Sequence, residues 1–393
     1  MTAPSTIAAT APAKTTHPYW LPLLMFCLGH FFIDLYSGAL GTMQPLLLTR
    51  FHMSYTEAGI LAGMMVFSSS VLQPVYGYFS DRFRSRMFTV LGPAIAGIFI
   101  SSLGLAPGYV GLLAMVWLGG AGIASFHPQA ASNAVANVRE NRGRAMAIFV
   151  CSGSLGLAMG PLFFSSLTRS GTLAQAPWGA LPGLFMSALL FVLMPPLAGT
   201  AVKGKRFDWR PLHAVWKPMT ILYFLVVIRS VVQITFTQML PLYLHKERGY
   251  SLPAAGLCLS LYLLGGAAGG FAGGSLADRF GGRRVIIVSM IGSVPFLALF
   301  VFGQGVLSTA GLFLGGLILL FTIPVNVVMA QELAPSQAGT VSALMMGFAW
   351  GMAGLIFIPL TGWFSDLFSM QWAFAGLIAF PLIGFLLALK LPK

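Results

Sequence analysis

Long apolar runs, separated by short polar segments, make up most of the chain. Twelve runs are each long enough to cross about 30 Å of hydrocarbon as a helix. Only 8% of the 393 residues are charged and 57% are hydrophobic, whereas soluble domains carry roughly 25% charged residues. The sequence therefore predicts an all-α integral membrane protein with twelve transmembrane helices. The predicted helices cover residues 20–48, 56–79, 87–106, 109–137, 144–169, 178–198, 218–245, 252–276, 285–303, 306–333, 338–364 and 370–390.

The first six runs and the last six are related by an internal repeat. The Asp-Arg-Phe segment 81–83, between the second and third runs, returns as 278–280 between the eighth and ninth, 197 residues later. Pro45 and Pro128 each have a counterpart 196 residues further along the chain. This internal symmetry predicts two pseudo-symmetric six-helix bundles.

Two segments lie outside the predicted bundles. Residues 1–18 are small and polar with no apolar core, so we expect a disordered cytoplasmic tail and not a cleaved signal. Residues 199–217 are polar and basic and are predicted to be a cytoplasmic linker. The linker would join an N-terminal bundle, residues 19–198, to a C-terminal bundle, residues 218–393.

Positive charge is distributed unevenly along the chain. If the N-terminus is cytoplasmic, 17 of the 22 Lys and Arg residues fall in cytoplasmic loops and tails, which predicts that both termini are cytoplasmic. The net charge of +13 is spread over short loops with no long basic tract, so nucleic acid is not an expected partner. The three cysteines lie within apolar runs, so neither a disulfide framework nor a thiolate metal site is expected.

Ionisable side chains inside the predicted membrane core are few, and each is a candidate functional group because charge is costly in hydrocarbon. His30, Asp34 and Gln44 share one face of the first helix, and Arg229 shares a face of the seventh with Gln233. The repeat places Asp34 and Arg229 at similar depth, because they precede equivalent prolines by 11 and 12 residues. The sequence therefore predicts a carboxylate and a guanidinium together near the midplane.

Further polar residues interrupt the fourth and tenth helices. The fourth contributes His127, Gln129 and Asn133, and the tenth contributes Asn326. A static buried ion pair that only fixes the helices is one interpretation of Asp34 and Arg229. The two histidines and the row of amides favour a functional site instead.

Several segments carry a family resemblance. The repeated halves with their Asp-Arg-Phe hairpins resemble the major facilitator superfamily. Residues 30–34 (HFFID), 72–78 (LQPVYGY) and 126–128 (FHP) resemble the fosmidomycin-resistance branch of that superfamily. Residues 156–161 (GLAMGP) partly resemble the fifth-helix motif of its proton-driven drug antiporters.

The resemblance implies both fold and function. It implies the major facilitator fold, with the first, fourth, seventh and tenth helices around a central cavity. It also implies a proton-coupled antiporter in a bacterial-type inner membrane that exports small polar or phosphonate-like compounds and so confers drug resistance. We expect a small-molecule substrate, protons and the lipid bilayer as partners, a proton gradient in place of any cofactor, and a functional monomer.

The two hairpins are predicted to gate the pathway. Asp81, Arg82, Asp278 and Arg279 lie where helices end at the predicted cytoplasmic face. A carboxylate there can accept hydrogen bonds from the N-terminus of a helix in the opposite bundle, and only while that side is closed. By resemblance, the partner helices are the eleventh for Asp81 and the fifth for Asp278. The alternative is a solvated basic loop that only sets topology.

We expect Asp34 to carry the proton, helped by His30 and His127. Anion binding is assigned to Arg229, with polar contacts from Gln233, Gln44, Gln129, Asn133 and Asn326. One alternative is export of a divalent metal or an organic cation through His30, Asp34 and His127, although a guanidinium at the same depth disfavours a cation. The other is an intramembrane enzyme, which the lack of a nucleophile motif or a His-Glu-x-x-His helix disfavours.

Overall fold

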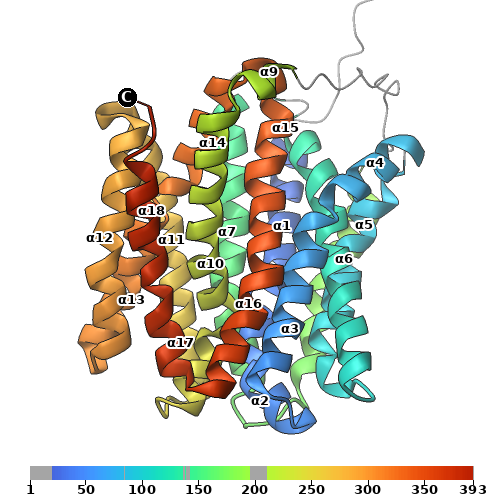
Figure 1. The fold of residues 1–393 in the computed structure, drawn as a ribbon. Coiled ribbons are helices and arrows are strands. Elements are labelled where there is room, and N and C mark those ends of the chain that lie inside the picture. The colour runs from blue at the N-terminus through green and yellow to red at the C-terminus, as the bar shows by residue number, and fades with distance from the viewer. Residues whose placement is uncertain (1–19, 84, 136–137, 139–141, 195–209, 393) are drawn as a thin grey trace, which may run out of the picture.

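The chain is helical wherever its structure is described. A computed structural model describes residues 20–83, 85–135, 138, 142–194 and 210–392, and these contain no strand. Eleven helices are long and apolar enough to span a membrane, and a shorter apolar helix supplies the remaining span (Figure 1). The predicted all-helical membrane fold is confirmed. The predicted tail, residues 1–18, and linker residues 199–209 lie outside the described residues.

The first six spans form the N-terminal bundle, and several consist of two or three consecutive helical segments. Their bounds are α1 (Trp20–Ser37) with α2 (Ala39–Phe51), α3 (Tyr55–Val66) with the π-helix η1 (Phe67–Val71) and α4 (Gln73–Phe83), α5 (Met87–Ser101), α6 (Tyr109–Ala134), α7 (Arg142–Leu167) and α8 (Ala180–Leu193).

The last six spans form the C-terminal bundle and follow the short helix α9 (Arg210–Ala214). Their bounds are α10 (Trp216–Lys246), α11 (Leu252–Phe280), α12 (Gly282–Phe302), α13 (Gly305–Leu319) with α14 (Thr322–Leu333), α15 (Ala338–Ser342) with the π-helix η5 (Ala343–Phe348) and α16 (Ala349–Leu367), and α17 (Met370–Leu377) with α18 (Ala379–Ala388).

The helix ends divide the molecule into two faces. The end of α18 and the hairpin between α11 and α12 lie at one face, hereafter the C-terminal face (Figure 1). The connections α2–α3 and α16–α17 lie at the opposite face, hereafter the far face. Serine residues cap the N-termini of several helices at the far face. Ser54 forms a capping box with Glu57, and Ser251 and Ser369 cap α11 and α17.

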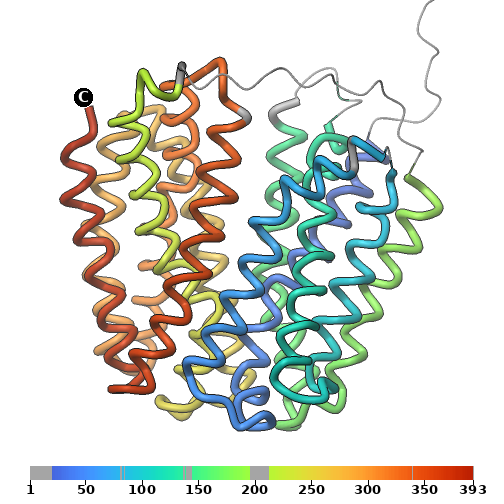
Figure 2. Tube along the Cα trace, turned by 45° about the vertical axis from the view of Figure 1, so that its right-hand side comes forward, coloured from blue at the N-terminus to red at the C-terminus, as the bar shows by residue number. Residues whose placement is uncertain are grey.

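The two bundles meet at the far face and diverge toward the C-terminal face (Figure 2). In the half of the molecule nearer the far face, α3 packs along α16 and α7 packs along α11. A methyl group added at Gly59 would lie 2.7 Å from the carbonyl oxygen of Ile358, and one at Gly63 would lie 3.2 Å from that of Gly354. Backbone therefore meets backbone between the bundles, as small residues permit in membranes.

Asp366 joins the bundles at the far face. Its two carboxylate oxygens accept hydrogen bonds from the backbone N–H groups of Tyr55 and Thr56, each at 2.8 Å, and one also accepts the Thr56 hydroxyl at 2.6 Å. The carboxylate at the end of α16 thus caps the N-terminus of α3, where N–H groups lack intrahelical acceptors and the helix dipole favours negative charge. A second link runs from Lys246 Nζ to Thr49 Oγ1, at 2.7 Å.

Replacing Asp366 should loosen the far-face closure. We expect Asp366→Ala to lower the closed-to-open ratio by roughly tenfold, because hydrogen bonds to a charged group each contribute about 1.5 kcal/mol or more. Spin labels at Arg50→Cys and Trp372→Cys, two exposed far-face positions in different bundles, would report a new long-distance population.

Glu247→Ala is the matched control. Glu247 accepts the N–H groups of Met370 and Gln371, at 2.6 and 2.8 Å, and so caps a helix of its own bundle. Its loss removes the same kind of cap without touching the contact between bundles. Identical distance distributions for Asp366→Ala and Glu247→Ala would contradict the role of Asp366.

Candidate functional site

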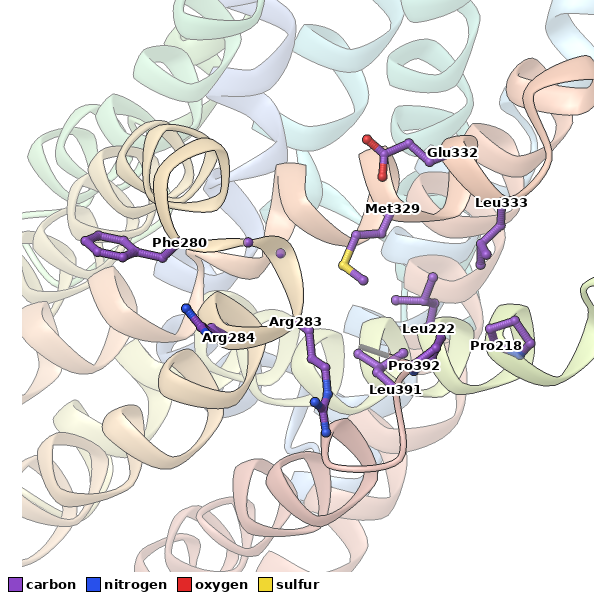
Figure 3. A pocket seen from close by; sticks show the side chains of 12 residues that line it. Pro218, Leu222, Phe280, Arg283, Arg284, Met329, Glu332, Leu333, Leu391 and Pro392 are labelled. Atoms are coloured by element: carbon purple, nitrogen blue, oxygen red, sulfur yellow. The ribbon is translucent and has the colours of Figure 1, made fainter.

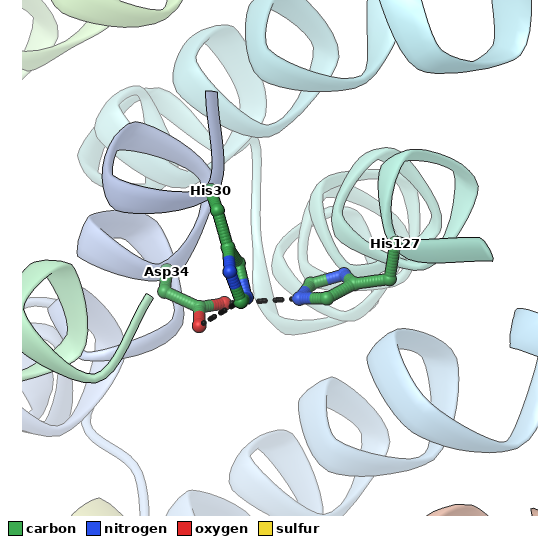
Figure 4. Close-up of side chains that lie close together, drawn as sticks. All are labelled: His30, Asp34 and His127. Carbon is green, nitrogen blue, oxygen red and sulfur yellow. Dashed lines mark ion pairs between the residues drawn. The ribbon is translucent and has the colours of Figure 1, made fainter. Parts of the chain in front are cut away.

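One carboxylate and two imidazoles meet inside the N-terminal bundle. Asp34 on α1 has one oxygen 3.2 Å from His30 Nε2 and the other 3.2 Å from His127 Nε2 of α6 (Figure 4). The imidazole rings meet edge to face, with centroids 5.2 Å apart. The structure thus brings together the three residues predicted to handle the proton. We call them the His–Asp–His cluster.

Backbone carbonyl groups fix the orientation of both imidazoles. Nδ1 of His30 lies 2.8 Å from the carbonyl oxygen of Phe149, and Nδ1 of His127 lies 2.8 Å from that of Ile123. A carbonyl oxygen only accepts, so Nδ1 carries the hydrogen in each ring. In a neutral imidazole Nε2 is then an acceptor. Two acceptor nitrogens therefore face the carboxylate oxygens of Asp34, and each contact becomes a hydrogen bond only when a proton enters it.

Close packing of α7 forms one wall of the cluster. A methyl group added at Gly153 would lie 2.3 Å from His30 Nε2 and 2.7 Å from an Asp34 oxygen. The Phe149 ring stacks on His30 with centroids 4.2 Å apart. Methyl groups added at Gly156 and Gly160 would clash with backbone carbonyl oxygens of α1. The glycines of α7 therefore let that helix approach α1 closely enough to hold the cluster.

The cluster is partly accessible. The side chains of Asp34 and His127 are 18% and 21% exposed, and the Ser37 hydroxyl is 3.4 Å from the carboxylate. Solvent can therefore reach the carboxylate. The three ligand atoms also lie within 4.8 Å of one another, a spacing and donor set that suit a divalent metal ion.

Arg229 lies in the other bundle and is almost fully buried, at 4% exposure. It donates to Gln233 Oε1, and its guanidinium carbon is 5.9 Å from the Trp350 ring centroid. Its Nε has no hydrogen-bond partner among the described residues, and the same holds for the Tyr262 hydroxyl and the Asn326 amide. These groups come from α10, α11 and α14, which pack together. The C-terminal bundle thus contains several buried polar side chains with unused hydrogen-bonding atoms.

The predicted proximity of Asp34 and Arg229 does not produce an ion pair. Among the described residues, the only ion-pair partners of Asp34 are the two histidines. The reason lies in the packing: α1 packs against α6 and α7 of its own bundle, whereas α10 belongs to the other bundle. Similar depth in the membrane did not imply contact.

Three of the predicted polar contacts have structural partners within the N-terminal bundle. Gln44 donates to the carbonyl oxygen of Ala58 at 3.3 Å and so ties α2 to α3. Gln129 accepts the Thr89 hydroxyl of α5 at 2.5 Å, and Asn133 donates within α6 at 2.8 Å. Gln129 faces α5 and His127 faces α1, because residues two apart point to different sides of a helix.

The hairpin residues lie at the C-terminal face. Arg82, Asp278 and Arg279 are exposed, and Asp278 has no hydrogen bond or ion pair within the described part of the chain. The side chain of Asp81 is not among those that the structure describes. The bundles are apart at this face (Figure 2), and Asp278 does not form the hydrogen bonds expected for a closed state with any described residue.

Some residues at the site carried no chemical signal in the sequence. Phe149 contributes a carbonyl group and a ring face, and Gly153 contributes the absence of a side chain. Tyr262 and Trp350 are aromatic residues in apolar helices, where aromatic residues are common. Only the spacing of glycines in α7 could have indicated the close approach to α1.

Comparisons with known proteins agree with this architecture. The family model of the Major Facilitator Superfamily matches residues 26–357 and 223–393. The MFS-type transporter YfnC of Bacillus subtilis (strain 168) is 31% identical over 354 residues, 88% of this chain and 86% of the relative. The fosmidomycin resistance protein of Escherichia coli (strain K12) is 27% identical over 358 residues, with the same coverage.

Solved structures share the fold at low sequence identity. A bacterial homologue of the human lysosomal transporter Spinster, in an inward-facing and occupied conformation, superposes with a TM-score of 0.81 at 15% identity over 95% of this chain and 97% of the other. A point mutant of the nucleoside transporter NupG gives 0.80 at 13% identity over 95% and 100%. With its helical halves, its repeat and these matches, the chain belongs to the Major Facilitator Superfamily of membrane transporters.

Proposed function

We propose that the chain is a proton-coupled antiporter that exports a small anionic, phosphonate-like compound by alternating access. The observation that carries the proposal is the His–Asp–His cluster, in which two oriented imidazole nitrogens face a partly accessible carboxylate. The similarity to a fosmidomycin resistance protein supports export and a phosphonate-like substrate.

The cluster is suited to taking up and releasing protons. Without an added proton, Asp34 faces two lone pairs, and each proton that enters converts one repulsive contact into a charge-assisted hydrogen bond. The Nδ1 hydrogen bonds to Phe149 and Ile123 keep both rings in place in either state. Asp34 is therefore the proposed carrier, with His30 and His127 as its partners.

Arg229 is the proposed anion-binding group. A guanidinium does not lose its proton in proteins, and its planar fork matches carboxylate or phosphonate oxygens. The free bonding capacity of Arg229 Nε, Tyr262 and Asn326 supports a polar ligand at this place, and Gln233 would hold the guanidinium in position. Because Gln129 and Asn133 are engaged within the N-terminal bundle, we leave them out of the binding site.

Coupling would then run through movement of the bundles. The proton site lies in one bundle and the anion site in the other, so proton and substrate would be linked across the interface and not through an Asp34–Arg229 ion pair. Protonation makes the cluster more positive and so favours anion binding. Antiport further requires that the carrier loaded with both ligands does not return, while the proton-loaded carrier without substrate does.

The C-terminal face, at which the two bundles are apart in this structure, would be the cytoplasmic face. Lys and Arg are concentrated in the loops of the C-terminal face, which favours a cytoplasmic location. The structure would then be open to the cytoplasm, with Asp366 closing the outside. In the opposite state Asp81 and Asp278, flanked by Arg82 and Arg279, would close the cytoplasmic side.

Export of a divalent metal is the second candidate, because three ligand atoms of the His–Asp–His cluster lie within 4.8 Å of one another. Both Nδ1 atoms bond to carbonyl oxygens, as the outer nitrogens of metal-binding histidines commonly do. The permanent positive charge of the buried Arg229 disfavours a cationic cargo. A comparison of substrates decides between the two candidates.

The proposed function predicts both resistance and coupling. Cells that express the chain should tolerate fosmidomycin better than cells with an empty vector, and should gain no tolerance to zinc or to tetraphenylphosphonium.

Asp34→Asn should abolish fosmidomycin export driven by a pH gradient in proteoliposomes, because the carrier loses its titratable group, yet retain substrate exchange. Ser37→Ala is the matched control, since it removes only a 3.4 Å contact to Asp34. Uphill export by Asp34→Asn at the wild-type rate would remove Asp34 as carrier, and tolerance to zinc alone would favour the metal.

Substrate charge is tested at Arg229. Arg229→Lys keeps the charge but loses the planar fork, so fosmidomycin should bind about tenfold more weakly. Arg229→Gln loses the charge too and should weaken binding by roughly a hundredfold. Calorimetric titration of the purified variants measures both changes. Binding of tetraphenylphosphonium, if any, should not weaken. Unchanged fosmidomycin affinity in both variants would contradict the anion-binding role.

Gating is tested at Asp278. We expect Asp278→Ala to slow transport by roughly fivefold or more, as typical couplings between states allow, because the state closed at the cytoplasmic side loses a helix cap. Initial rates in proteoliposomes measure the effect. The melting temperature should stay within a few degrees of wild type, because Asp278 is exposed and forms no hydrogen bond or ion pair with a described residue. A wild-type rate would leave the hairpin as a topological signal only.

A further inference from the structure

A basic cavity lies at the C-terminal face, within the C-terminal bundle. Its volume is about 580 Å³, in the range of small-ligand sites. Its walls come from α10, the α11–α12 hairpin, α14 and the chain end after α18 (Figure 3). Its charged residues, within the described part of the chain, are Arg283, Arg284 and Glu332, and Phe280 and Met329 are among its apolar ones. It contains none of the residues assigned to proton or substrate binding.

The charges in this cavity leave capacity for an anion. Arg283 donates to the carbonyl oxygen of Leu389 at 2.9 Å, while its Nε is buried without a partner among the described residues. Arg284 and Glu332 are exposed, and neither forms an ion pair within the described part of the chain. Among the described lining residues, two guanidinium groups face one carboxylate, which gives these side chains a net positive charge.

The backbone adds to the positive potential. Helix α12, 21 residues long, begins at Gly282 beside the cavity. The N–H groups of its first turn have no acceptors within the helix, and the helix dipole is positive there. A phosphate group in the cavity would therefore meet guanidinium and backbone donors together.

A second cavity, of about 330 Å³, adjoins the first and shares Phe280 and Arg284 with it. Apart from Arg284, its lining is apolar and includes Leu276, Val288 and Phe321. Val288 is the seventh residue of the 21-residue membrane-spanning helix α12 and is 58% exposed, so it faces the lipid. An apolar groove open to the bilayer thus leads into a basic cavity, with Arg284 at the junction.

We propose that these two cavities together bind one anionic phospholipid. Its phosphate lies against Arg283, Arg284 and the start of α12, and an acyl chain lies along Val288. Charge-assisted hydrogen bonds from guanidinium groups are the strong contacts that phosphate makes in proteins, and basic pockets between membrane helices select anionic head groups. A soluble phosphate would use only the basic cavity and leave the adjoining groove unexplained. This site goes beyond the proposed transport function.

The test uses the full-length purified chain in detergent with palmitoyl-oleoyl-phosphatidylglycerol as probe, and binding is followed by native mass spectrometry. Phosphatidylglycerol should bind about tenfold more tightly than phosphatidylcholine. Arg284→Gln should remove that preference, because it loses a charge-assisted hydrogen bond worth about a factor of ten. Arg50→Gln, which removes an exposed arginine from the far face, should keep the preference. Val288→Trp fills the groove and should weaken phosphatidylglycerol binding.

Two outcomes would overturn the proposal. Equal binding of phosphatidylglycerol and phosphatidylcholine, or the same result for Arg284→Gln as for Arg50→Gln, would show that the cavity does not recognise the head group. Competition by glycerol 3-phosphate as strong as that by phosphatidylglycerol, with Val288→Trp without effect, would assign the cavity to a soluble anion. Fosmidomycin export by Arg284→Gln, measured in parallel, keeps this result separate from the transport proposal.

Discussion

The carboxylate of Asp34 inside a membrane-spanning helix is the constraint on which the site depends. A carboxylate in hydrocarbon is costly unless it has partners, and here the partners are two imidazoles instead of a permanent cation. Their orientation depends on carbonyl oxygens of α6 and α7. The position of α7 depends in turn on Gly153, which leaves room for the cluster. Three helices of the N-terminal bundle therefore pack around one carboxylate.

The two bundles hold different chemistry. The N-terminal bundle carries a cluster of titratable side chains, and the C-terminal bundle carries a permanent cation near the ring of Trp350. In the proposed mechanism this separation makes the relative position of the bundles the variable that links proton and substrate. The far-face contacts fit such a role, because Asp366 holds the bundles together through hydrogen bonds that can break without disturbing either core. Alternating access needs interfaces of this kind.

The candidate site was partly predictable. His30, Asp34 and His127 were recognisable because ionisable groups are rare in apolar helices, and the structure joins them in one cluster. The placement of Gln129 was less predictable, because a stripe on a helix shows which residues share a face without showing which neighbour that face meets. Gln129 meets α5 inside its own bundle. Asp34 and Arg229 form no ion pair for a related reason: internal symmetry relates depth, and depth does not set the distance between helices.

The sequence by itself determined the class of fold, the approximate spans of the helices and the division into related halves. These follow from local apolarity and from a repeat, both of which are written along one dimension. Tertiary structure alone decided which groups face each other across helices, which face of the molecule is closed, and where backbone atoms serve as partners. Asp366 illustrates the difference: in the sequence it is one acidic residue near a loop, and in the fold it caps α3, some 310 residues earlier in the chain. Contacts of that kind depend on how whole bundles pack, and no short stretch of sequence specifies the partner.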